Sequence, residues 1–115
     1  MSEINDLIAK IIKFRDERDW KQFHTPKDLA FSIMLEAAEL AEHFQWKNGD
    51  EVEVYISNHK QVIGEELADL LYLILLMSKD LSIEIRDAFE NKMMKNEIKY
   101  PVNKSKGRNS KYSEL

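Results

Sequence analysis

Apolar residues along the chain recur mostly three and four positions apart, which is the spacing of one face of an α-helix. Ile4, Leu7, Ile8 and Ile11 mark the first such face, and their pattern predicts a helix that ends near Asp19. Because helical spacing continues through most of the chain, the sequence predicts an all-α fold, a four-helix bundle.

Sequence signals at helix ends place the neighbouring elements. Thr25 is suited to cap a second helix, with proline at its first position and Asp28 three residues after the cap. This helix should end near Trp46, before the Asn-Gly pair at 48–49. The polar segment 51–63 is either a separate short helix or the first turns of the third. A fourth helix, from Ile85, should stop before Tyr100-Pro101.

The most apolar run, Leu70–Met77, has no polar atom except the Tyr72 hydroxyl, so as a helix it should be buried against several neighbours. A strand is possible for eight such residues, but the helix-forming residues before the run favour a helix. Glu66 and Asp69 precede the run and lie three residues apart, so they share one face of the predicted helix. Two carboxylates so close to a core require a cation.

Length and composition indicate one domain, since 115 residues with 43% hydrophobic and 33% charged can form a small core. We assign residues 1–100 to this domain and 101–115 to a basic, flexible tail. The net charge is −4, and the tail contributes +3, which leaves −7 on the domain and argues against a nucleic acid polymer as partner. An apolar first-helix face on so short a chain favours assembly with further copies of itself.

Features that the sequence lacks limit where the protein can be located and which atoms can bind a metal. It contains no apolar stretch of 18 residues and no signal-like N-terminus, so a cytoplasmic protein without a membrane partner is expected. It also contains no cysteine, so a bound metal must be held by oxygen or imidazole.

A second acidic pair, Glu36 and Glu39, repeats the spacing of Glu66 and Asp69 on the second predicted helix. If the two helices pack antiparallel, the four carboxylates can converge on one point. An all-oxygen cluster suits Mg²⁺ or Mn²⁺, and Mg²⁺ is commonly shared between carboxylates and substrate phosphates. The constellation therefore points to phosphate chemistry.

Simpler explanations exist for the same residues. A single E-x-x-E pair is usually a solvated helix face, and the whole chain could be a non-catalytic helical module for protein–protein interaction. A di-iron bundle would need Glu-x-x-His pairs, and the position of His43 does not fit that spacing. His43 and His59 are expected at the surface, and His24 in a loop hydrogen bond.

The two acid motifs resemble those of the MazG-like all-α nucleoside triphosphate pyrophosphohydrolases, whose signature is E-x-x-E followed by E-x-x-D. The segments 17–24, 44–47 and 92–101, in this order, are similar to the dCTP pyrophosphatase branch, and the likeness covers nearly the full chain. An acid that often precedes the first family motif is replaced here by Leu35.

This resemblance implies a Mg²⁺-dependent enzyme, possible also with Mn²⁺, that cleaves a nucleoside triphosphate to the monophosphate and pyrophosphate. The substrate implied is dCTP or a modified dCTP, in a house-cleaning role for the nucleotide pool, and the assembly a homodimer or homotetramer. The implied metal ligands, which are also the catalytic groups, are Glu36, Glu39, Glu66 and Asp69. The implied substrate contacts are Trp20 and Trp46 for the base, Lys92 for phosphate and Asn96 for the nucleotide.

One departure from the branch concerns the sugar. The branch places a tyrosine four residues after the motif aspartate, where this chain has Leu73, with Tyr72 one position earlier. One residue is about 100° of rotation on a helix, so Tyr72 is expected to point away from the sugar. Glu36 or Glu39 is the expected proton acceptor for the attacking water.

Overall fold

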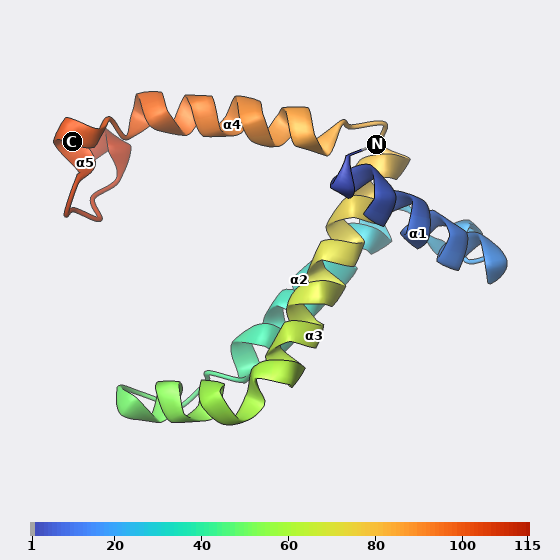
Figure 1. Ribbon diagram of the computed structural model, residues 1–115, viewed down its shortest axis with the longest axis horizontal. Coiled ribbons are helices and arrows are strands. Elements are labelled where there is room, and N and C mark those ends of the chain that lie inside the picture. The colour runs from blue at the N-terminus through green and yellow to red at the C-terminus, as the bar shows by residue number, and fades with distance from the viewer. Residues whose placement is uncertain (1) are drawn as a thin grey trace. The chain divides into compact units, whose positions relative to one another are not determined.

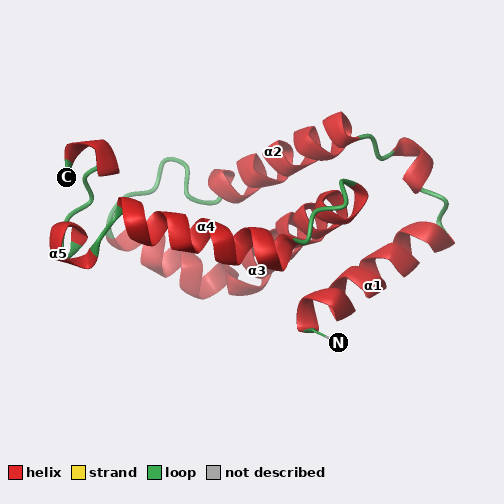
Figure 2. Cartoon of the chain, turned by 90° about the horizontal axis from the view of Figure 1, so that it is seen from above, coloured by secondary structure: helices red, strands yellow, loops and turns green. Residues whose placement is uncertain are grey.

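The computed structural model describes residues 2–115, which form helices joined by turns, with no strand among them (Figure 2). The long helices are α1 (Glu3–Glu17), α2 (Pro26–Glu42), α3 (Asp50–Asp80) and α4 (Ile85–Lys99). Short helical turns are η1 (Lys21–Phe23), α5 (Val102–Ser105) and η2 (Tyr112–Glu114). The predicted all-α class is confirmed.

The chain divides into two compact units, the first ending at Ser82 and the second spanning Ile83–Leu115. In the first unit, α2 and α3 lie side by side and run in opposite directions, and α1 also packs on α3 (Figure 1). The second unit contains α4, α5 and η2. In this unit the ring of Tyr112 meets the ring of Tyr100 edge to face, with centroids 6.1 Å apart.

Helix α2 begins as the sequence predicts. The Thr25 hydroxyl oxygen accepts a hydrogen bond of 3.1 Å from the Asp28 backbone N–H, which satisfies one of the free donors at the helix start. The helix ends at Glu42, earlier than predicted, and the chain continues in turns to Trp46, whose φ of 69° is incompatible with a continuing helix.

The segment 51–63 belongs to α3, but the helix is kinked within it. His59 has non-helical angles, φ −132° and ψ 22°, so the first turns of α3 point in a different direction from the rest. Both predicted alternatives therefore hold in part. The end of α4 at Lys99, directly before Tyr100-Pro101, is confirmed.

The core of the first unit is small. Its fully buried apolar side chains are Leu29, Leu75 and Leu76. The prediction that the run 70–77 is buried all round is wrong, since Leu71 and Ile74 are 47% and 40% exposed. The neighbouring helices of the unit cover only part of the circumference of α3, so one side of an apolar helix faces outward.

A buried ion pair joins the C-terminal end of α1 to that of α3. Arg15 donates two hydrogen bonds, of 2.7 and 2.8 Å, to the two carboxylate oxygens of Asp80. The Arg15 side chain is 3% exposed and that of Asp80 14%. The pair fixes the end of α1 against α3, which places the loop after α1 beside the middle of α3.

Within residues 2–115, no helix is long and apolar enough to span a membrane.

Candidate active site

The two acidic motifs lie on adjacent helices of the first unit. Glu36 and Glu39 are on α2, and Glu66 and Asp69 are on α3, where the three-residue spacing puts each pair on one helical face. The inner acid of each pair, Glu36 and Glu66, is half-buried, whereas Glu39 and Asp69 are exposed. Each pair therefore extends from the helix interface to solvent.

The carboxylates influence one another across the interface. Burial raises the pKa of Glu36, and the negative charges of Glu39, Asp69 and Glu66 raise it further. Like charges in a shared site oppose ionisation, so one proton or one cation would relieve the repulsion. The cluster thus favours a positive ligand.

Two carboxylate oxygens in this cluster lack hydrogen-bond partners. Oε2 of Glu36 and Oε2 of Glu66 are both buried and unpaired. An unpaired buried acceptor typically costs about 1–3 kcal/mol, which a cation would recover. Within residues 2–115, no three acidic or imidazole side chains are arranged so that they could hold a metal ion. Side-chain rotation would therefore accompany metal binding, and oxygen donors of this kind suit a hard divalent cation.

An aromatic cavity of about 420 Å³ adjoins the acids. It lies between α1, the loop after α1 and the middle of α3, and its lining residues are Lys10, Ile11, Phe14, Trp20, Ala68, Asp69 and Tyr72. Asp69 belongs to both the cavity and the acid cluster. A flat aromatic ring could therefore occupy the cavity while an attached anionic group reached a cation held by the acids.

The cavity wall is built from perpendicular aromatic contacts. The ring of Phe14 meets Trp20 edge to face with centroids 5.6 Å apart, and meets Tyr72 in the same manner at 6.2 Å. Asp19, with φ 54°, makes the sharp turn that returns Trp20 toward α3, and the Trp20 backbone N–H donates to the Arg15 carbonyl oxygen. Trp20 remains 41% exposed, which leaves its ring accessible for stacking.

A model of the MazG-like family matches residues 31–115. The chain belongs to the MazG-like family. Its resemblance to that family, predicted from the acid motifs, is confirmed.

The MazG-like chain is similar over nearly its whole length to proteins named dCTP pyrophosphatase 1. The mouse (Mus musculus) protein is 35% identical over 114 residues, which are 97% of this chain and 67% of the mouse protein. The human (Homo sapiens) protein is 33% identical with the same coverage. The crystal structure of a pyrophosphatase from Archaeoglobus fulgidus superposes with a TM-score of 0.83 at 40% identity, covering 88% of this chain and 94% of that chain.

Tyr72 is part of the cavity wall, and its expected orientation away from the sugar stays a prediction. It lies one position before the expected tyrosine, and yet it lines the cavity together with Trp20. Burial raises the pKa of its hydroxyl, so the group is neutral and can donate a hydrogen bond. The turn after α1 places Trp20 beside Tyr72, so that both side chains line the cavity. The rotation of residues along α3 alone does not predict this neighbour.

Three other residues are expected at the site, one in the first unit and two in the second. Trp46 is 87% exposed in the loop between α2 and α3 and is not part of the cavity wall. Lys92 and Asn96 lie on α4 of the second unit. Their contacts with a nucleotide stay predictions.

Two histidines behave differently from the sequence interpretation. Nδ1 of His24 is buried without a hydrogen-bond partner, instead of making the expected loop hydrogen bond, and burial followed by the charge of Arg15 lowers the pKa of its ring. His43 is not a free surface residue, since its Nε2 lies 3.2 Å from Oε2 of Glu66. No sequence spacing signals this contact, because it depends on how the chain turns after α2.

Proposed function

We propose that this chain hydrolyses dCTP, or a dCTP modified on its base, to the monophosphate and pyrophosphate. The chain is a nucleotide pyrophosphatase of the MazG-like family, and its relatives over 97% of its length bear the name dCTP pyrophosphatase 1. The observation that carries the proposal is the position of Asp69. This residue joins an aromatic cavity, suited to a base, to an acid cluster suited to a metal-bound triphosphate.

Family members of this kind use divalent metal ions, and the acids of this chain fit one. We assign the ion as Mg²⁺, with Mn²⁺ as a substitute, and its ligands as Glu36, Glu39, Glu66 and Asp69. When bound, such an ion polarises phosphate oxygens and lowers the pKa of coordinated water. The unpaired buried Oε2 of Glu36 supports this assignment.

The remaining roles belong to groups of the chain itself. Glu36 or Glu39 accepts the proton of the attacking water, through a carboxylate oxygen that the ion does not engage. Trp20 stacks on the base, which is worth about 1–3 kcal/mol per stacked base. Tyr72 closes the cavity beside it.

We also propose the contacts that the family pattern implies for the rest of the chain. Trp46 adds to the base pocket, Lys92 contacts a phosphate and Asn96 hydrogen-bonds the nucleotide. The active form is a homodimer or homotetramer, located in the cytoplasm, and it removes unwanted nucleotides from the pool.

The test is a panel of triphosphates in which pyrophosphate release is measured with Mg²⁺, with Mn²⁺ and after chelation. The panel contains dCTP, 5-substituted dCTP, dUTP, dTTP and the ribonucleotides. We expect release that depends on the metal and is fastest with dCTP or its 5-substituted form. If no triphosphate yields pyrophosphate, the chain acts as a helical interaction module and the proposal is wrong.

A further inference from the structure

His43 connects the acid cluster to the kinked part of α3. It follows α2 directly, and its side chain is 15% exposed, next to the 21% exposed side chain of Glu66. Nδ1 of its ring is hydrogen-bonded to the Tyr55 hydroxyl, and Nε2 faces Oε2 of Glu66 at 3.2 Å. One imidazole thus lies between a tyrosine and a proposed metal ligand.

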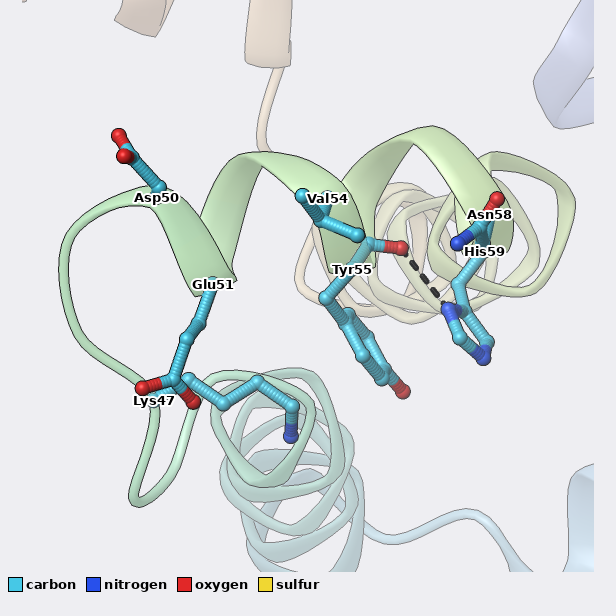
Figure 3. A pocket seen from close by; sticks show the side chains of 7 residues that line it. All are labelled: Lys47, Asp50, Glu51, Val54, Tyr55, Asn58 and His59. Atoms are coloured by element: carbon cyan, nitrogen blue, oxygen red, sulfur yellow. Dashed lines mark hydrogen bonds between the residues drawn. The ribbon is translucent and has the colours of Figure 1, made fainter.

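Tyr55 is itself held on both faces of its ring, beside a pocket that Figure 3 shows. The ring of His59 stacks on it with centroids 3.9 Å apart and an interplanar angle of 11°. The Lys47 ammonium lies 4.2 Å from the centroid of the Tyr55 ring. The non-helical angles of His59 let its Nδ1–H donate to the Tyr55 carbonyl oxygen at 2.8 Å (Figure 3). The kink therefore fixes the direction of the Tyr55 hydroxyl.

The contacts define which atoms of His43 and Glu66 are engaged. The Glu66 carboxylate can only accept a hydrogen bond, so it favours the tautomer of His43 with the proton on Nε2, in which Nδ1 accepts from the Tyr55 hydroxyl. Nε2 of His43 and Oε2 of Glu66 are close enough for a hydrogen bond, but they are not aligned for one. Oε2 of Glu66 therefore has no hydrogen-bond partner. A small rotation of either group aligns the two. Oε1 of Glu66 stays available for another ligand.

We propose that His43 is a positioning residue of the metal site: held by Tyr55, it orients the Glu66 carboxylate so that one oxygen is directed to the cation. This inference rests on the proposed function, because it takes Glu66 as a metal ligand. Groups that orient metal-binding side chains typically change metal affinity or activity by 10- to 100-fold when they are replaced. Sequence spacing gave no sign of the Tyr55–His43–Glu66 connection.

The test is the dissociation constant for Mn²⁺ of the full chain without nucleotide, measured by electron paramagnetic resonance. We expect His43→Leu to weaken Mn²⁺ binding by about 10- to 100-fold. His43→Gln, which keeps a side-chain N–H, should restore part of the affinity. Tyr55→Phe should weaken binding several-fold, with no further effect when it is added to His43→Leu, because the hydroxyl acts only through His43. Tyr112→Phe, which removes a hydroxyl from an exposed tail residue, is the matched control and should bind as wild type.

The outcomes separate this inference from the proposed function. If His43→Leu and His43→Gln bind Mn²⁺ as tightly as wild type, or more tightly, while Glu66→Gln loses binding, the positioning role is wrong and the metal site stands. If Glu66→Gln also binds as wild type, both are wrong. Loss of thermal stability in the His43 variants with unchanged Mn²⁺ affinity would assign His43 a structural role only and overturn the inference.

Discussion

At the scale of single residues, Asp69 both lines the aromatic cavity and belongs to the acid cluster. Its face of α3 carries Ala68 and Tyr72 toward the aromatic cavity and Glu66 toward α2. The small Ala68 leaves room beside Trp20, so the cavity can accept a flat ring next to the acids. The base and the triphosphate of one nucleotide can therefore be bound by consecutive turns of a single helix.

The role of Trp20 can be tested through substrate affinity. Trp20→Ala removes the exposed stacking surface, and we expect KM for the preferred triphosphate to rise about 5- to 100-fold, as the loss of one stacked base predicts. The change in kcat should be smaller, because stacking stabilises the bound substrate and the transition state alike. Steady-state kinetics give both quantities.

Phe23→Ala is the control for Trp20→Ala. Phe23 is 65% exposed on the neighbouring η1 turn and is not part of the cavity wall. Its replacement should leave KM unchanged. An unchanged KM for Trp20→Ala would contradict the assignment of the cavity to the base.

Single residues also show what the sequence could predict at the site. Helical spacing alone placed the acids of each motif on one face, because that relation is local. The contacts of His43 and the cavity position of Tyr72 could not be predicted, since they depend on a loop after α2, a turn at Asp19 and a kink at His59. The turn at Asp19 and the kink at His59 are non-helical conformations at residues without a strong sequence signal, and the Asn-Gly pair in the loop after α2 predicts a break but not its direction.

At the scale of elements, α3 organises the first unit. It packs on α2 through the acid-bearing turns and on α1 through its C-terminal part, where Arg15 and Asp80 pair. The hydrogen bonds from Arg15 lower the pKa of Asp80. A carboxyl whose pKa is lower in the folded state stabilises the fold above its ordinary pKa of about 3.8 and loses this contribution as the pH falls through the lowered value.

We predict that Asp80→Asn lowers the free energy of unfolding at pH 7 by about 3 kcal/mol, because it leaves a buried guanidinium without its counter-ion. Urea unfolding at pH 7 and at a series of acidic pH values gives the measurement. The difference between the two proteins should shrink as the pH falls well below 3.8, where the wild-type carboxyl is also protonated.

Glu17→Gln provides the control for this pair. Glu17 meets Lys13 at 3.9 Å on the exposed face of α1, and a solvent-exposed pair of this kind contributes about 0.5 kcal/mol or less. Equal destabilisation by the two substitutions would show that the Arg15–Asp80 pair does not hold α1 on α3.

At the scale of the whole molecule, many apolar side chains are exposed to solvent although few are buried in the core. Exposed apolar side chains recur along α2 and along the middle of α3: Phe31 is 53% exposed, Met34 55%, Leu35 59%, Leu67 52% and Leu71 47%. Monomeric proteins rarely expose continuous apolar stripes of this kind. A second copy of the chain would cover them in the homo-oligomer, which stays a prediction.

The oligomer can be tested by sedimentation velocity at micromolar concentration. We expect the wild type to sediment as a dimer or a larger assembly. Phe31→Glu, which puts a charge into the apolar stripe of α2, should shift the protein toward monomer, whereas Lys27→Glu at the exposed start of α2 should not. A monomeric wild type would contradict the prediction.

The sequence predicts the helices and their ends more accurately than it predicts which side chains are buried. The starts of α2 and α4 and the end of α4 agree with the cap, proline and periodicity signals. The apolar run of α3 correctly predicts a helix, but burial on all sides would require neighbours that the single first unit does not supply. Periodicity reports which residues avoid water, and it does not report whether the same chain or another copy covers them.

The central claim is that the acids on α2 and α3 form the catalytic metal site. The most direct test compares pyrophosphate release from dCTP by Glu66→Gln and by Glu65→Gln, the exposed neighbour on the same turn of α3. We predict at least a 100-fold loss of kcat for Glu66→Gln with an unchanged circular dichroism spectrum, as expected when a catalytic metal ligand is replaced. Glu65→Gln should keep wild-type activity. Equal, wild-type activity of the two variants would contradict the account.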